Sequence, residues 1–126
     1  MAELGKLLFS KDHEWVRLDG RSARVGITDF AQDSLGDVVF VQLPSIGMAV
    51  TSGQSVSEVE STKSVSDIYS PVNGTISAVN VELESDPSLL NSDPFGRGWI
   101  YELSVDAHVD LGHLIDEDAY RRFVKE

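Results

Sequence analysis

The chain has 126 residues, of which 41% are hydrophobic and 25% are charged, and these proportions are ordinary for one globular domain with a single core. Its 21 acidic residues outnumber its 10 basic ones, which gives a formal net charge of −11. This charge argues against nucleic acid as a partner, because phosphate binding needs a basic face.

The sequence carries no sign of disulfides, secretion or membrane insertion. It contains no cysteine, which is compatible with a reducing compartment. No apolar run reaches the roughly 18 residues that a membrane helix needs, and the opening MAELGKLLFSKDHEW lacks the layout of a secretory signal. We therefore expect no membrane partner. The expected location is the cytoplasm of a bacterium, or the mitochondrial matrix for a processed eukaryotic chain.

Residues 12–28 alternate apolar and polar side chains around Asp19-Gly20, a dipeptide that favours hairpin turns. The pattern predicts two antiparallel strands joined at this turn. The side chains expected to reach the core are Trp15, Val16, Val25 and Ile27.

A short helix and another strand are expected next. Thr28 is a favourable N-cap residue for a helix over DFAQDSL, and Gly36 is a favourable stop. The following stretch, DVVFVQLP, is rich in β-branched and aromatic residues, which favour a strand that ends at Pro44.

From Ile46 onward, short β-prone stretches are separated by turn residues such as Asn73-Gly74. This spacing indicates a compact barrel or sandwich rather than an α/β fold. Within this region, the segment EVESTKSVSDIY at 58–69 has stretches of similar length and composition on both sides of Lys63. We expect Lys63 to lie at the tip of a hairpin.

The C-terminal part combines a loop, a strand and a helix. Residues 83–105 predict a loop or short helix followed by a strand centred on WIYEL. In the tail, apolar residues recur at helical spacing, so we expect a helix over about 111–125 with Asp116 as its cap. The apolar residues of this helix are Leu114, Ala119, Tyr120, Phe123 and Val124.

A lysine at a hairpin tip has an ordinary interpretation and a functional one. The ordinary interpretation is a solvated residue that protects a sheet edge. The functional one is a covalent acceptor, because a lysine at the apex of a tight turn can enter the active site of a modifying enzyme. Ser61, Thr62 and Ser64 leave room for such an approach. A lysine amine is a poor nucleophile unaided, so its modification needs an enzyme.

Four blocks of the sequence resemble one family. These are HEWV at 13–16, GITDFAQDSLGDVVFVQLP at 26–44, EVESTKSVSDIYSPVNG at 58–74 and SLLNSDPFGRGWIYEL at 88–103. In content, order and spacing they are similar to the H protein of glycine cleavage, and the resemblance spans nearly the whole chain.

The resemblance implies a mainly β fold, the barrel-sandwich hybrid of lipoyl and biotinyl domains. It has two antiparallel sheets, a short helix in the N-terminal half and a C-terminal helix. The expected single lipoyl-carrier domain covers residues 1–126, with an N-terminal hairpin over about 12–28, a lipoyl-like core over about 29–105 and a helix over about 111–125.

The resemblance also implies a function. Lys63 would carry lipoate in amide linkage, and the protein would be a non-catalytic shuttle, expected to be a monomer. It would take an aminomethyl group from the pyridoxal-phosphate glycine decarboxylase to a tetrahydrofolate-dependent aminomethyltransferase, and dihydrolipoamide dehydrogenase would reoxidise it. A lipoate-attaching enzyme would be a fourth partner.

A loaded arm would end in an ammonium group that water can release, so a protecting cleft needs an acidic group and an apolar wall. Glu14 matches a family position that resembles such a partner, and Asp67 lies four residues after Lys63. Asp12 stands where relatives often have a small residue, and Ser34 stands where some have histidine. For each carboxylate, an ordinary surface position is the alternative.

Other classes of protein fit less well. Biotin acceptors typically carry the sequence methionine–lysine–methionine at the hairpin tip, whereas Thr62 and Ser64 flank Lys63 here. Lipoyl domains of 2-oxoacid dehydrogenases are tethered by Pro/Ala-rich linkers, which this chain lacks. No nucleophile, base and oxyanion arrangement indicates an enzyme. Spacing among the histidines predicts no metal site. An unmodified binding protein, and a role in delivering lipoate to other proteins, stay open.

Overall fold

The computed structural model describes residues 7–106 and 108–125. Within these residues the chain forms nine strands and four helices. The strands are β1 (Leu7–Phe9), β2 (Glu14–Asp19), β3 (Ser22–Ile27), β4 (Val38–Gln42), β5 (Ala49–Val50), β6 (Ser55–Ser61), β7 (Val65–Tyr69), β8 (Gly74–Val79) and β9 (Tyr101–Ser104). The helices are α1 (Asp29–Leu35), α2 (Glu82–Ser85), α3 (Leu89–Ser92) and α4 (Glu117–Lys125).

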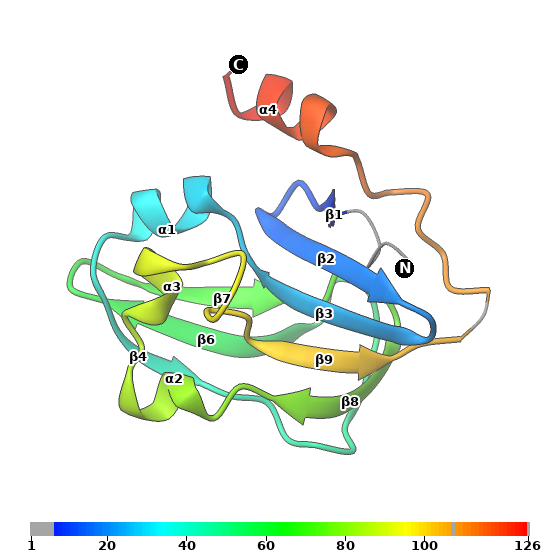
Figure 1. The fold of residues 1–126 in the computed structure, drawn as a ribbon, viewed down its shortest axis with the longest axis horizontal. Helices are drawn as coiled ribbons and strands as arrows, with labels where there is room; N and C mark the ends of the chain where they lie inside the picture. The colour runs from blue at the N-terminus through cyan, green and yellow to red at the C-terminus, as the bar shows by residue number, and fades with distance from the viewer. Residues whose placement is uncertain (1–6, 107, 126) are drawn as a thin grey trace.

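The strands form two antiparallel sheets. The larger sheet has the order β1-β2-β3-β9-β8-β5, and the smaller one has the order β4-β6-β7. Figure 1 shows β2, β3, β9 and β8 side by side in one layer, with α1 and α3 at one end of the molecule. This arrangement confirms the predicted mainly β fold with two antiparallel sheets. None of the described helices is long and apolar enough to cross a membrane.

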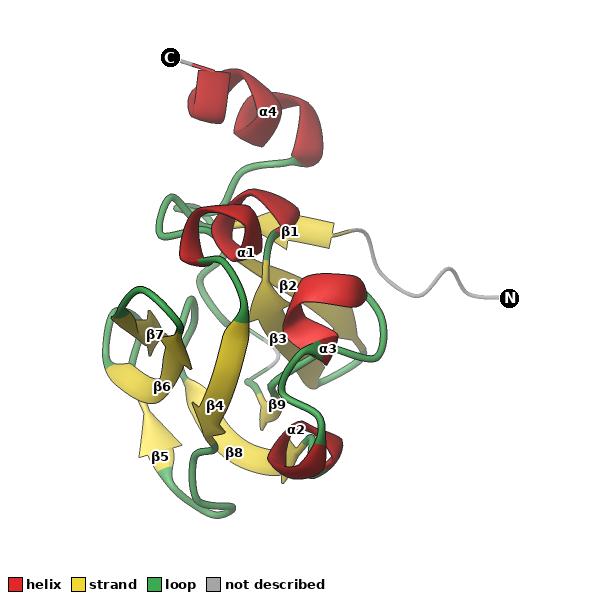
Figure 2. Cartoon of the chain, turned by 90° about the vertical axis from the view of Figure 1, so that its left-hand side faces the viewer, coloured by secondary structure: helices red, strands yellow, loops and turns green. Residues whose placement is uncertain are grey.

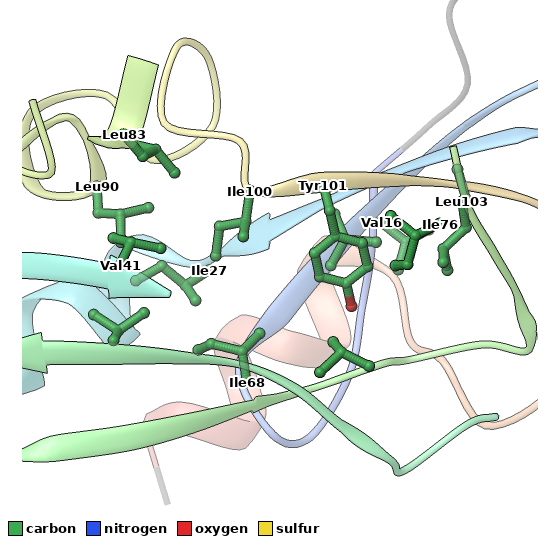
Figure 3. Packing of buried hydrophobic residues seen from close by; sticks show 14 of the residues in the cluster. Val16, Ile27, Val41, Ile68, Ile76, Leu83, Leu90, Ile100, Tyr101 and Leu103 are labelled. Atoms are coloured by element: carbon green, nitrogen blue, oxygen red, sulfur yellow. The ribbon is translucent and has the colours of Figure 1, made fainter. Parts of the chain in front are cut away.

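The core lies between the two sheets because alternate residues of each strand point inward. Figure 3 shows Val16, Ile76 and Tyr101 of the larger sheet and Val41 and Ile68 of the smaller one in the same cluster of buried side chains. These five side chains are at most 5% exposed. Burying such residues is the main force that holds the sheets together.

The predicted N-terminal hairpin is confirmed. Strands β2 and β3 pair from Asp19↔Ser22 onward, and Gly20 has a φ of +64° in the turn. The predicted core side chains of this hairpin are all at most 1% exposed. They serve different clusters, however, because adjacent residues of a strand face opposite sides. Val16 faces the smaller sheet, whereas Trp15 packs in a second cluster with Phe9 and Tyr120.

The predicted ends of α1 are also confirmed. The Thr28 hydroxyl accepts a hydrogen bond from the Ala31 N–H at 3.1 Å, which satisfies one of the free donors of the first turn. At the other end, Gly36 has a φ of +81°, a conformation that favours glycine. Strand β4 then ends at Gln42, just before Pro44, as expected.

The C-terminal helix begins later than predicted. Helix α4 begins at Glu117 rather than at about 111, because Ile115 is extended and its backbone exchanges two hydrogen bonds with Phe9, at 2.8 and 2.9 Å. Asp116 caps the helix as expected, since its carboxylate accepts from the Ala119 N–H at 2.9 Å. Figure 2 shows α4 beyond α1 and β1, at the edge of the molecule.

Candidate functional site

Lys63 lies in the three-residue loop, Thr62 to Ser64, that joins β6 to β7. The Ser61 N–H donates to the Ser64 carbonyl at 2.8 Å and closes this loop. The Ser61 hydroxyl accepts from the N–H groups of Lys63 and Ser64, both at 3.1 Å. These contacts fix the backbone of the tip without using the Lys63 side chain.

The tip rests on the end of α1. The Thr62 N–H donates to the Asp37 carbonyl at 3.0 Å. The aliphatic stem of Lys63 passes over Gly36, where a Cβ atom would lie only 3.0 Å from the lysine Cε. A side chain at position 36 would therefore crowd the lysine stem.

Asn91 of α3 holds the segment from Gly36 to Val38, on which the hairpin tip rests, in place. Its side-chain amide donates to the Gly36 carbonyl at 2.8 Å, and its side-chain oxygen accepts from the Val38 N–H at 2.9 Å. Sequence reasoning did not single out Asn91. No local pattern indicates the role, because its partners lie more than 50 residues away in the chain.

Lys63 is exposed, and it forms no ion pair within the described residues. Its predicted position at a hairpin tip is therefore confirmed. An exposed amine on a fixed turn is accessible to an enzyme that acylates it. Whether the amine carries a group stays a prediction.

A cleft of about 310 Å³ lies between α1 and β7, beside the hairpin tip. Ile27, Phe30, Ala31, Leu35 and Ile68 supply its apolar wall. Its polar lining consists of Asp12, His13, Ser34, Ser64, Ser66 and Asp67. Ser64 directly follows Lys63 in the chain, so a group attached to Lys63 starts at the edge of this cleft.

Two of the three candidate carboxylates share the cleft. Asp67 comes from β7, and Asp12 comes from the turn before β2. Both side chains are exposed. Ser34 of α1, the position at which some relatives carry histidine, lines the same cleft. The site can therefore present negative charge to a cation and an apolar wall to a hydrocarbon.

Glu14 is placed differently. Its side chain is 1% exposed and lines an adjoining hollow of about 230 Å³, to which Asp12 also contributes. Its carboxyl oxygens accept from the Ser10 hydroxyl at 2.8 Å and from the Tyr69 N–H at 3.1 Å. The last contact joins the two sheets. The alternative of an ordinary surface carboxylate is wrong for Glu14, because the residue is buried.

Burial raises the pKa of Glu14 to about 8, since a charged carboxylate loses its water in this position. The hydrogen bonds from Ser10 and Tyr69 act in the opposite direction, and the negative charge of Asp12 adds to the increase. Near neutral pH, Glu14 is therefore largely protonated.

His13 joins the cleft to the C-terminal helix. Its ring packs against Phe30, with 4.9 Å between centroids, and its Nδ1 is hydrogen bonded to the Tyr120 hydroxyl at 2.8 Å. Burial lowers the pKa of His13. The residue also has a φ of +71°, an uncommon backbone conformation. The contacts of His13 with Phe30 and Tyr120 fix the turn that carries Asp12.

The described residues gather no three His, Asp or Glu side chains in a group suited to a metal ion. His113 instead contacts the Pro71 carbonyl and lies 3.4 Å from the Ser52 hydroxyl.

Trp15 and Trp99 are structural residues. Trp15 donates from Nε1 to the Pro94 carbonyl at 2.9 Å, and the Arg24 guanidinium lies 4.3 Å from the Trp99 ring centroid.

Comparison with known proteins agrees with this geometry. Residues 7–126 match the family described as Glycine cleavage H-protein. The glycine cleavage system H protein of Mycobacterium sp. (strain KMS) is 53% identical, with all of both chains covered. That of Mycobacterium avium (strain 104) is 54% identical over 95% of each chain. The crystal structure of a glycine cleavage system H protein from Mycobacterium marinum aligns with a TM-score of 0.88 at 39% identity, covering 97% of this chain and 98% of that one.

Proposed function

The chain belongs to the glycine cleavage H-protein family, and on this basis we propose that Lys63 carries lipoate in amide linkage. As a member of this family, the protein is a lipoyl carrier rather than a catalyst. The observation that supports the attachment site most strongly is the exposed Lys63 on a turn that is held by Ser61 and by the backbone.

The residues around Lys63 fit a lipoyl arm. The apolar wall of the cleft suits the hydrocarbon chain, and the cleft begins at the residue next to Lys63. When attached, lipoate supplies a dithiolane whose sulfur atoms can accept and release an aminomethyl group. Attachment replaces one N–H bond of the Lys63 amine with an amide bond to the acyl carbon. The activating group leaves, and the amine proton passes to a base of the attaching enzyme.

Asp12 and Asp67 are the proposed partners of the ammonium group at the end of a loaded arm. Both carboxylates line the cleft, where they can attract a cation while the apolar wall limits access of water. Glu14 is proposed to help through the adjoining hollow, where cation binding would favour loss of its proton. None of these three residues performs a chemical step. They hold the arm between visits to the enzymes.

We further propose four partner enzymes. The pyridoxal-phosphate glycine decarboxylase loads the arm, the tetrahydrofolate-dependent aminomethyltransferase unloads it, and dihydrolipoamide dehydrogenase restores the disulfide. A lipoate-attaching enzyme acts before them. The net charge of −11 favours partners with basic entrances, so their Michaelis constants for this protein should rise with salt. This charge also opposes self-association, which agrees with a monomer.

The bacterial origin of the curated relatives favours the cytoplasm over the mitochondrial matrix as the location.

The attachment site can be tested by substituting Lys63→Arg, with Lys11→Arg as the matched control. Both changes keep the positive charge, and both positions are exposed. With lipoate, ATP and a lipoate-attaching enzyme, wild-type protein and the Lys11 variant should gain the mass of one lipoyl group. The Lys63 variant should gain none and should not support glycine cleavage in a reconstituted system. Full activity of the Lys63 variant would contradict the proposal.

A further inference from the structure

The outer face of the smaller sheet carries an unusual pair of exposed apolar side chains. Phe40 of β4 is 52% exposed and Val65 of β7 is 58% exposed. Both pair in register with Glu60 of β6, which lies between them. Residues that lie directly opposite one another in antiparallel strands share a face. These three residues therefore form one row across the sheet, which we call the tip row.

The tip row lies next to Lys63. Val65 is two residues after the lysine, and Glu60 is three residues before it. The next row along the same face is formed by Gln42, Glu58 and Asp67. Its side chains are polar and exposed, and two of them are acidic. The exposed apolar side chains of these two rows thus lie at the end of the sheet that bears the lysine. One carboxylate, Glu60, lies in the tip row, and two more, Glu58 and Asp67, lie in the next row.

Single exposed apolar residues are common on protein surfaces and need no explanation. The tip row differs because two such residues flank one carboxylate at the strand spacing of about 5 Å. Exposed aromatic side chains such as Phe40 are enriched at protein interfaces, whose rim is polar.

From this arrangement we infer that the tip row is the docking surface for the enzyme that acylates Lys63. This inference rests on the proposed function and names the partner of its attachment site. The acylating enzyme must bring its reactive carbon to the amine itself, which stands on a stem of only four methylene groups. It must therefore contact the neighbours of Lys63. The other enzymes act at the far end of a longer arm, which lets them reach it without contacting these neighbours.

Charge defines the chemistry of this partner. Glu58, Glu60 and Asp67 place three carboxylates on the outer face, and the strands of this sheet contribute no basic residue. The matching surface is basic opposite these carboxylates and apolar opposite Phe40 and Val65. A second copy of this chain is a poor occupant, because it would bring like charges together and its net charge is also −11.

The test measures the kinetics of Lys63 acylation with lipoate, ATP and a lipoate-attaching ligase. The variants are Phe40→Ser and Val65→Ser. The matched control is Ile46→Ser, which removes an apolar side chain that is 66% exposed, in the loop beyond the far end of β4. Circular dichroism and thermal unfolding establish that each variant is folded.

We expect each tip-row variant to raise the Michaelis constant of the ligase for this protein about ten-fold, with a smaller change in turnover. The Ile46 variant should match the wild type. Glu60→Gln should weaken the dependence of the Michaelis constant on salt, because it removes one carboxylate from the contact.

Three outcomes would overturn the inference. The Michaelis constant could stay unchanged in both tip-row variants. The variants could acylate normally but impair glycine decarboxylation by protein that is already lipoylated, which would assign the row to a later partner. They could alter only a concentration-dependent dimer in sedimentation, which would assign it to a second copy. If the wild type is never acylated, the proposed function itself fails, and that result is distinct from the other three.

Discussion

The hairpin tip around Lys63 and the aromatic cluster around Tyr120 are built in opposite ways. At the tip, hydrogen bonds of the backbone and of Ser61 hold the turn, and the Lys63 side chain supports nothing. In the cluster, Phe9, Trp15 and Tyr120 are fully buried and hold together segments that are far apart in the sequence. A substitution at the tip should therefore cost function, and one in the cluster should cost stability.

The two regions meet through the cleft. Tyr120 hydrogen bonds to His13, at 2.8 Å, and to the Thr28 hydroxyl, at 2.7 Å. His13 lines the cleft, and Thr28 caps the helix that forms its wall. An ion pair of 2.8 Å between Arg121 and Asp29 adds a further link between α4 and α1. The C-terminal helix thus positions one side of the cleft without lining it.

The largest expected loss of stability comes from Tyr120→Ala. Removing a fully buried aromatic ring, stacked on Phe9 at 4.7 Å, should lower the free energy of unfolding by about 3–5 kcal/mol. Tyr120→Phe keeps the ring and should cost about 1–2 kcal/mol, because His13 and Thr28 lose a partner. Urea denaturation measures both values. If Tyr120→Ala were as stable as the wild type, the cluster would not be the stabilising region.

The ionisation of Glu14 should make the stability of the fold depend on pH. Its pKa is about 8 in the folded protein, above the ordinary value of 4.5, so the folded state holds the proton more tightly than the unfolded chain does. The stability that this proton provides is complete below about pH 4.5 and is lost as pH rises through about 8. Glu14→Gln cannot ionise and should avoid this loss.

The difference in unfolding free energy between Glu14→Gln and the wild type should therefore shift in favour of the variant between pH 4.5 and pH 9. The shift should reach up to about 4 kcal/mol. Urea denaturation at several pH values measures it. Parallel pH profiles for the two proteins would show that burial does not raise the pKa of Glu14.

Gly36→Ala tests the support beneath the lysine, with a smaller expected effect. A φ of +81° should cost alanine about 1–2 kcal/mol. Its new Cβ should also press on the Lys63 stem and slow acylation a few-fold. Gly47→Ala is the matched control, because it has a φ of +94° but nothing within 4 Å of a Cβ atom. It should lose stability but keep the acylation rate. Equal acylation rates for all three proteins would show that the contact with Gly36 does not matter.

Features of the fold that depend on neighbouring residues could be predicted from the sequence. The turn at Asp19-Gly20, the helix cap at Thr28 and the hairpin at Lys63 follow from local pattern, and the structure confirms their positions. Lys63 could be singled out as an acceptor only with the help of the family resemblance, because a pattern of strands and turns also fits a solvated loop.

Features that depend on distant contacts could not be predicted in this way. The start of α4 was placed too early because the Ile115 backbone pairs with Phe9, more than 100 residues away. Glu14 appeared as a possible surface carboxylate because its hydrogen-bond partner, Tyr69, follows it by 55 residues. The supporting role of Asn91 depends in the same way on the end of α1 and the start of β4.

The central claim is that one exposed amine on a rigid turn is the tether, and peptide mapping tests it most directly. The sequence has four lysines, at positions 6, 11, 63 and 125. After incubation with lipoate, ATP and a lipoate-attaching ligase, trypsin should no longer cleave after Lys63. The peptide that spans residues 25–97 should then appear intact, with the mass of one added lipoyl group. Cleavage after Lys63 together with a lipoyl group on another lysine would contradict the account.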